Sequence, residues 1–177
     1  MLMRPATAAD IPAVAAMILS RSAWLEEQGW PTWRDDADAL AAQADHTPST
    51  EHSMWVLDND GRIVGCTTVL TSAPPWGWTT EEFTEPASYL YTTCTDPAYQ
   101  AAKPGTLIAL WAVDHAARLG QRWVRRGCLF PGLVNYYQRQ GFTLQHTVPR
   151  TNRTVYLLAR RAELLPELDK SLAFANA

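Results

Sequence analysis

The sequence predicts an α/β protein, and three local patterns carry this prediction. Residues 87–95 are rich in Tyr, Thr and Leu, as a strand is, and apolar residues then recur at helical spacing over 104–119. Residues 54–57 and 62–71 are strand-like runs, and the Asp-Asn-Asp-Gly sequence between them is typical of a tight hairpin turn. Residues 7–10, Thr-Ala-Ala-Asp, have the spacing of a capping box and precede an apolar periodic segment, which predicts a helix start.

The other elements follow from the same periodicities and from proline and glycine boundaries. Predicted strands occupy residues 2–4, 54–57, 62–71, 87–95, 123–130, 142–148 and 153–160, and predicted helices occupy residues 11–25, 34–44, 104–119, 131–140 and 162–174. Residues 73–86 contain three prolines and two tryptophans, so we expect a long loop there.

The strand, loop and helix at residues 87–120 form the first candidate for a binding site. Asp96-Pro97 ends the strand, and Pro104 suits the first position of the helix that follows. Backbone N–H groups gather at such a helix start, at the positive end of the helix dipole, and Lys103 adds a cation beside them. This arrangement favours a phosphate or pyrophosphate, although units of this kind that bind nothing are common in α/β folds.

The composition restricts the class of protein. One domain is expected at 177 residues, and the net charge of −3 argues against a general nucleic-acid-binding protein. The cysteines are widely spaced and odd in number, which indicates free thiols in a reducing compartment; they are Cys66, Cys94 and Cys128. The early apolar run at 11–19 is too short to span a bilayer, so we expect a cytoplasmic protein with no membrane anchor. The histidines lack metal-ligand spacing, so we expect no metal; they are His46, His52, His115 and His146.

The order of these elements resembles the GCN5-related N-acetyltransferase (GNAT) fold. Residues 4–18, RPATAADIPAVAAMI, look like the opening strand and helix of that family. Residues 97–106, PAYQAAKPGT, look like its acyl-CoA loop, and residues 137–142, YQRQGF, look like its tyrosine, three residues and Gly-Phe before the final hairpin. The chain departs from the family where Lys103 replaces the first loop glycine and where Phe130 stands in place of a frequent asparagine.

The resemblance implies an α/β (α+β) fold with a mixed, mostly antiparallel central sheet of about seven strands flanked by about four helices. The GNAT-like acyltransferase domain would occupy residues 1–161, and a C-terminal extension would occupy residues 162–177. The activity implied is N-acetylation of an amine, by direct attack on acetyl-CoA, the co-substrate, in a ternary complex.

The resemblance also implies roles for particular residues. The strand edge at 93–95 would pair with the pantetheine arm, and the loop at 100–106 would hold the pyrophosphate. The cofactor-binding residues implied are Thr93, Cys94, Thr95, Gln100, Ala101, Ala102, Lys103, Gly105 and Thr106. Tyr137, four residues before Gly141, stands where the general acid of the family usually lies, and a phenol with a pKa near 10 suits a thiol leaving group.

The acceptor pocket is expected between residues 24–33, WLEEQGWPTW, and the loop at 73–86, because both bring indoles and carboxylates that suit a cationic amine. The residues expected to bind the acceptor are Trp24, Glu27, Trp30, Trp33 and Tyr91. The general base stays open among Glu26, Glu27, Glu81, Glu82, Glu85 and Tyr91. A covalent role for Cys94 is disfavoured, since no histidine is placed to activate it.

The function expected is therefore acetyl transfer from acetyl-CoA to the primary amine of a small molecule. A protein or peptide amine is the alternative acceptor, and a non-catalytic acyl-CoA-binding sensor is the alternative outside the enzyme class. The partners expected are a small-molecule amine and, where the chain self-associates, a second copy in a homodimer, with no nucleic acid and no membrane.

Overall fold

The computed structural model describes residues 1–45, 52–170 and 172–174 of the chain. Its α-helices are α1 (Ile11–Glu27), α2 (Ala37–Ala41), α3 (Thr80–Thr84), α4 (Pro104–Arg118) and α5 (Pro131–Gln138). Its strands are β1 (Leu2–Pro5), β2 (His52–Asn59), β3 (Arg62–Leu70), β4 (Ala87–Thr95), β5 (Trp123–Cys128), β6 (Thr143–Arg150), β7 (Arg153–Arg161) and β8 (Ala173–Phe174). Its 3-10 helices are Ala8–Asp10, Ala42–Ala44, Pro97–Ala102 and Pro166–Lys170.

The chain folds into two compact units, each built from segments that are distant in the sequence. The first unit comprises Met1–Val69, Thr92–Ile108 and Glu167–Ala177, and the second comprises Leu70–Tyr91 and Ala109–Pro166. Strand β4 and helix α4 each run from one unit into the other. The division into a domain over 1–161 and an extension over 162–177 stays a prediction.

The strands form the mixed, mostly antiparallel sheet that the sequence predicted, with helices on its faces. The strand order is β4-β3-β2-β1-β8 in the first unit and β6-β7-β5-β4 in the second, so β4 contributes to both. Strands β1 and β2 are antiparallel, as are β5 and β7 and also β6 and β7. Strand β4 is parallel to β5, and β8 is parallel to β1.

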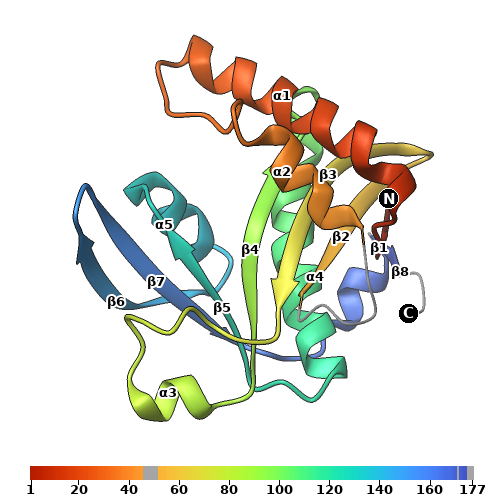
Figure 1. The fold of residues 1–177 in the computed structure, drawn as a ribbon. Helices are drawn as coiled ribbons and strands as arrows, with labels where there is room; N and C mark the ends of the chain where they lie inside the picture. Colours follow the sequence, from red (N-terminus) through yellow and green to blue (C-terminus); the bar gives the residue numbers. More distant parts are fainter. Residues whose placement is uncertain (46–51, 171, 175–177) are drawn as a thin grey trace. The chain divides into compact units, whose positions relative to one another are not determined.

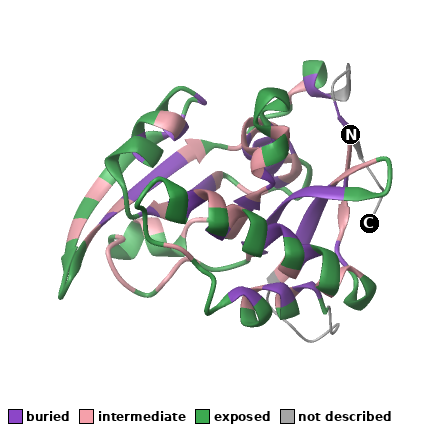
Figure 2. Ribbon diagram, turned by 90° about the horizontal axis from the view of Figure 1, so that it is seen from above, coloured by how far each residue is buried: buried purple, intermediate pink, exposed green. Residues whose placement is uncertain are grey.

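Helix α1 buries one face in the core of the first unit. Val14, Met17 and Ile18 are at most 4% exposed and recur at helical spacing. They pack in one hydrophobic cluster with Met54 and Val56 of β2. Figure 1 shows α2 beside α1, and in Figure 2 buried and exposed residues alternate along the helices, as expected where one face of a helix covers a core.

The hairpin of β2 and β3 is confirmed, and its turn has the geometry that the sequence predicted. Asp60 and Gly61 have positive φ angles of 52° and 87°. Both central residues of a type I′ turn need this conformation, which Asp and Gly tolerate. The Gly61 N–H also donates to Asp58 Oδ1 over 2.7 Å, which closes the turn.

Helix α5 belongs to the second unit and packs against β5, β6 and β7. Its buried residues are Val134 and Tyr137, and the Tyr137 ring meets Phe142 edge to face with centroids 5.3 Å apart. Gly141, with φ of 79°, ends the turn between α5 and β6. The Tyr-x-x-x-Gly-Phe motif thus forms the end of one helix and its packing contact.

Two sequence predictions are wrong. The predicted loop at 73–86 contains helix α3, because Thr79 and Glu82 form a capping box in which each side chain accepts from the other's backbone N–H (3.2 and 2.8 Å). The predicted helix at 162–174 is instead a 3-10 helix followed by β8, since Pro166 cannot lie inside an α-helix and Leu168 and Leu172 are buried without one.

The predicted helix at 34–44 is also shorter than expected. It consists of α2 followed by the 3-10 helix Ala42–Ala44. Within the described residues, no helix has the length and apolar character needed to cross a lipid bilayer.

The start of α1 is held by an ion pair that generates a first prediction. Arg4 donates to both oxygens of Asp10 (2.8 and 2.9 Å), and these hydrogen bonds lower the pKa of Asp10 from 3.8 to about 2. Because the folded state lowers this pKa, the stabilisation is complete above the ordinary pKa and is lost as the pH falls toward 2. Asp10→Asn should therefore cost about 1 kcal/mol of unfolding free energy at neutral pH, with a difference that shrinks between about pH 4 and pH 2.

Urea unfolding of both proteins across this pH range measures that difference. Asp38→Asn, which changes an exposed carboxylate on α2, is the control for the loss of one negative charge. Parallel stability curves for wild type and Asp10→Asn down to pH 2 would show that the pair does not stabilise the fold.

Candidate functional site

The C-terminal half of β4 lies beyond the stretch that pairs with β5. Its parallel register with β5 runs from Ala87↔Trp123 to Leu90↔Arg126 and ends there. On the other side, the Asp96 N–H donates to the Val64 carbonyl of β3 over 3.0 Å. N–H groups two residues apart on a strand point to the same side, so those of Thr93 and Thr95 point away from β3.

The side chains of this half-strand are fixed by packing. The Thr93 hydroxyl hydrogen-bonds the Thr67 hydroxyl of β3 over 2.8 Å. Cys94 is 3% exposed, and burial raises the pKa of its thiol to about 12. A thiol in this state is not a thiolate at neutral pH, which removes Cys94 as a nucleophile. What this segment offers a ligand is therefore its backbone.

The loop after β4 is held by Asp96. Its carboxylate accepts from the Ala98 N–H (2.9 Å) and from the Arg62 guanidinium (2.8 Å), and the residue is 5% exposed. Lys103 then adopts a left-handed conformation with φ of 53°, and its N–H donates to the Gln100 carbonyl over 3.0 Å. These contacts fix the backbone conformation of Lys103 at the start of α4.

The start of α4 offers fewer backbone donors than the sequence alone indicated. Pro104 has no N–H, and the N–H groups of Thr106 and Leu107 donate to the Lys103 carbonyl over 2.9 and 3.2 Å. Gly105 supplies the other N–H of this turn. The Lys103 side chain is exposed, so a phosphate here would depend more on that ammonium than on the backbone.

Tyr137 lies buried in the second unit, 3% exposed. Its hydroxyl accepts a hydrogen bond from Arg126 Nη1, and the guanidinium carbon lies 3.9 Å from the centroid of its ring. Burial raises the pKa of Tyr137 to about 12, and the charge of Arg126 opposes that rise. The phenol is therefore protonated at neutral pH, as a proton donor must be.

Four of the residues expected to bind the acceptor come from one segment of the first unit. Trp30 is 53% and Trp33 is 40% exposed, and Glu27 is also exposed. The guanidinium of Arg21 lies 4.4 Å from the Trp24 ring centroid. The fifth, Tyr91, is 56% exposed and belongs to the second unit.

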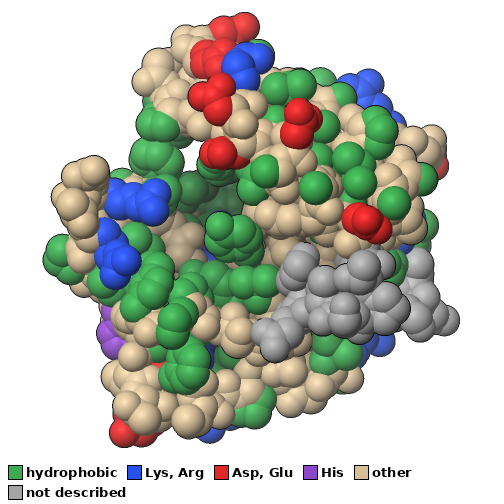
Figure 3. All heavy atoms as spheres, viewed as in Figure 1, with side chains coloured by type: hydrophobic (Ala, Val, Ile, Leu, Met, Phe, Trp, Pro, Cys, Tyr) green, Lys and Arg blue, Asp and Glu red, His purple; other side chains and the backbone are tan. Residues whose placement is uncertain are grey.

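Exposed carboxylates accompany these indoles. Figure 3 shows acidic side chains over the surface formed by the C-terminal end of α1 and the segment after it. The exposed acidic residues of this segment are Glu26, Glu27, Asp35, Asp36 and Asp38. Their summed charge attracts cations to this part of the first unit.

Comparison with known proteins identifies the family. The family model described as "Acetyltransferase (GNAT) family" matches residues 18–142, well over half of the sequence. The chain belongs to the GNAT acetyltransferase family. No curated protein matches the sequence.

Solved structures share this GNAT fold at low sequence identity. The paia N-acetyltransferase from Thermoplasma acidophilum, in complex with coenzyme A, has a TM-score of 0.67 at 13% identity over 90% of this chain and 97% of that chain. The aminoglycoside 6'-N-acetyltransferase from Enterococcus faecium has a TM-score of 0.64 at 14% identity, over 94% and 99%. The ribosomal-protein-S18-alanine N-acetyltransferase from Escherichia coli has a TM-score of 0.64 at 13% identity, over 92% and 94%. Identities this low show the fold and not the substrate.

Two of the carboxylates that are candidates for the general base, Glu26 and Glu82, have partners that lower their pKa. The hydrogen bond from Arg34 (2.6 Å) lowers the pKa of Glu26. Burial acts to raise the pKa of Glu82, but hydrogen bonds from the Thr79 N–H and His146 outweigh it, so that this pKa lies below its ordinary value. A general base works best with a pKa near the working pH, so neither carboxylate is well suited.

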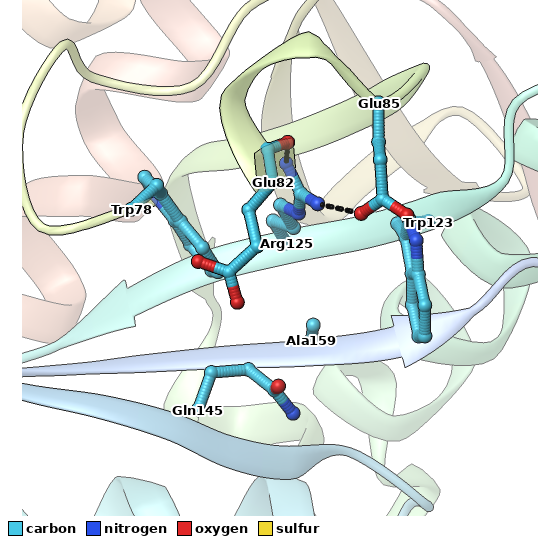
Figure 4. A pocket seen from close by; sticks show the side chains of 7 residues that line it. All are labelled: Trp78, Glu82, Glu85, Trp123, Arg125, Gln145 and Ala159. Carbon is cyan, nitrogen blue, oxygen red and sulfur yellow. Dashed lines mark hydrogen bonds and ion pairs between the residues drawn. The ribbon is translucent and has the colours of Figure 1, made fainter. Parts of the chain in front are cut away.

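A hollow of about 200 Å³, solvent at its mouth included, opens within the second unit, and the candidate bases Glu82 and Glu85 line it (Figure 4). It is lined by Trp78, Glu82, Glu85, Trp123, Arg125, Gln145 and Ala159. Arg125 points toward α3 and donates to Glu85 Oε2 (2.7 Å) and to the Glu82 carbonyl. Within the described residues, the Trp78, Trp123 and Arg125 side chains each leave a buried N–H without an acceptor. The hollow therefore presents donors and paired carboxylates, which does not suit a cationic amine.

Sequence reasoning missed Arg126, the partner of Tyr137. A basic residue in a run of arginines is usually exposed, yet Arg126 is only 7% exposed. The available signal was its place in a strand between Val124 and Cys128, both buried, where alternation directs all three side chains to one face. No group of His, Cys, Asp and Glu in the described part of the chain could hold a metal ion, and His46 lies outside that part.

Proposed function

We propose that this chain is an acetyl-CoA-dependent N-acetyltransferase that acts on the primary amine of a small molecule. The observation that carries the proposal is the C-terminal half of β4, which lies beyond the register with β5 and leads directly, within one unit, into the Lys103 loop and the start of α4. An extended arm with amide groups fits the backbone groups of Thr93 and Thr95, and the pyrophosphate of the same molecule fits Lys103. Coenzyme A combines both features.

The donor-binding residues proposed are Thr93, Cys94, Thr95, Gln100, Ala101, Ala102, Lys103, Gly105 and Thr106. Cys94 acts through its backbone, since its thiol is buried. The N–H of Thr93 points to the side on which β5 does not pair, so it is the donor proposed for the oxyanion of the tetrahedral intermediate.

The reaction proposed is direct transfer. The amine nitrogen attacks the thioester carbon, the carbon–sulfur bond breaks, and its electron pair goes to sulfur. Tyr137 gives its phenolic proton to the sulfur, and the nitrogen loses its extra proton to a base or to water. Because burial keeps the Tyr137 phenol protonated, the donor form is the one present at neutral pH.

The acceptor proposed is a cationic small molecule, bound with the help of Trp24, Glu27, Trp30, Trp33 and Tyr91. Exposed indoles beside several carboxylates attract an ammonium and contact its carbon skeleton. The E. faecium structure is that of an aminoglycoside acetyltransferase and the E. coli structure that of a ribosomal-protein acetyltransferase. Both acceptor classes therefore belong in the assays. The three free, buried cysteines favour a cytoplasmic protein.

A sensor that binds acyl-CoA without turnover is the second candidate, and the start of α4 favours it. Pro104 lacks an N–H and the Thr106 N–H is already bonded, so the phosphate site is weaker in backbone donors than a glycine-rich loop. Turnover distinguishes the candidates, because a sensor binds acetyl-CoA and releases no free thiol with any amine.

Lys103→Ala tests the donor site. Without the Lys103 ammonium, the pyrophosphate of acetyl-CoA should bind more weakly in the ground state and in the transition state alike. KM for acetyl-CoA should therefore rise about tenfold while kcat stays nearly constant. Steady-state kinetics measure both constants, with Arg139→Ala, an exposed cation on the second unit, as control. An unchanged KM in Lys103→Ala would remove the lysine from the donor site.

Tyr137→Phe tests the enzyme itself. The substitution keeps the ring and removes the proton, so kcat should fall by roughly 10² to 10⁴ while acetyl-CoA affinity changes little. Thiol release with a panel of small amines and amine-bearing peptides gives kcat, and calorimetry gives the affinity. If kcat is the same in both proteins, Tyr137 is not the acid; if wild type binds acetyl-CoA and acetylates no amine, the sensor is correct.

A further inference from the structure

Strand β5 carries two adjacent buried arginines, and among the described residues only Arg125 has a carboxylate partner. Arg125 is 2% exposed and pairs with Glu85 at 2.7 Å. Arg126 is 7% exposed, pairs with no Asp or Glu of the described chain, and its Nε has no hydrogen-bond partner there. A guanidinium removed from water without a counter-ion costs free energy, so stability does not account for Arg126.

The groups that surround Arg126 are weak acids. Its Nη1 donates to the Tyr137 hydroxyl, its guanidinium carbon lies 3.9 Å from the centroid of the Tyr137 ring, and it also hydrogen-bonds the Cys128 thiol. Tyr89 of β4 is near enough for its charge state to act on Arg126. The titratable groups that face Tyr137 are Arg126 and Cys128 from β5 and Tyr136 from α5. A guanidinium in this place stabilises whichever neighbour loses its proton.

We propose that Arg126 is a positioning residue, which fixes the Tyr137 hydroxyl and stabilises the phenolate left when Tyr137 protonates the departing thiolate. The inference rests on the proposed function. As the carbon–sulfur bond breaks, the phenolic proton moves to sulfur, the oxygen keeps the electron pair of its O–H bond, and Arg126 becomes the counter-ion of that oxygen. The phenolate later recovers a proton from water. The buried Arg126 guanidinium therefore lacks a counter-ion in the resting enzyme and has the Tyr137 phenolate as its counter-ion during the reaction.

The energetics agree with this role. Burial raises the pKa of Tyr137 to about 12, which makes the phenol a poor acid, and the charge and hydrogen bond of Arg126 act in the opposite direction. Arg125 serves no such role, since its carboxylate partner already neutralises it. Two neighbouring residues of the same type therefore provide a matched comparison.

The contact is tested in the free protein, without reference to activity. A fluorotyrosine at position 137 ionises at lower pH than tyrosine, and its titration is followed by fluorine NMR. Arg126→Met should raise the pKa of this phenol, and Arg126→Lys should raise it less, because the lysine keeps the charge and loses the planar fork. Arg125→Met should leave the titration unchanged, because Arg125 pairs with Glu85.

The catalytic part is tested by a double-mutant cycle. Arg126→Met should lower kcat about tenfold to a hundredfold, the value of a hydrogen bond to a charged group, and should cause no further loss in the Tyr137→Phe background. A merely structural arginine would lower kcat by the same factor in both backgrounds. Should Arg126→Met fail to fold, Arg126→Lys enters the cycle in its place.

The two tests separate this inference from the proposed function. An unchanged titration in Arg126→Met overturns the inference while Tyr137 can still be the acid. Additive losses in the cycle overturn it as well. If wild type acetylates no amine, the proposed function fails and the catalytic role of Arg126 fails with it, and the titration then shows whether the contact itself is correct.

Discussion

The pairing of β4 is the constraint on which the proposed donor site depends. Up to Leu90 the strand has β5 on one side, and beyond Leu90 that pairing ends. Backbone N–H and C=O groups beyond Leu90 that point away from β3 face the side on which an extended ligand can pair with the strand. The partner proposed for this side is the extended, amide-bearing arm of coenzyme A, which would pair with the backbone of Thr93 and Thr95.

The backbone geometry of the proposed donor segment could be predicted from sequence because it is local. Thr93 to Thr106 are consecutive, and strand propensity, a proline boundary and a helix start determine their geometry. The hairpin turn at Asp60 and Gly61 was predictable for the same reason, since only a few residue types tolerate positive φ. Local sequence patterns failed to predict segments whose structure depends on contacts with residues far away in the sequence. The segment 162–174 is placed by pairing of β8 with β1, which no local pattern shows.

The surroundings of Tyr137, the proposed acid, depend on such a distant contact. Tyr137 could be found through its motif, but its environment comes from Arg126 on another element. The sequence shows only two adjacent arginines, which local rules read as a solvated face. Burial on opposite faces of one strand separates their roles: Arg125 meets the carboxylate of Glu85, and Arg126 meets a phenol and a thiol. Charge pairing of this kind depends on the fold and not on sequence spacing.

The central claim is that coenzyme A pairs with the backbone of the C-terminal half of β4, and residue-resolved amide hydrogen exchange tests it most directly. Saturating acetyl-CoA without an acceptor should slow exchange at the Thr93 and Thr95 amides, which face away from β3, and leave the Met3 amide of β1 unchanged. Calorimetry on the same sample shows whether the ligand is bound. Acetyl-CoA that binds while Thr93 and Thr95 exchange as fast as in the free protein would contradict the claim.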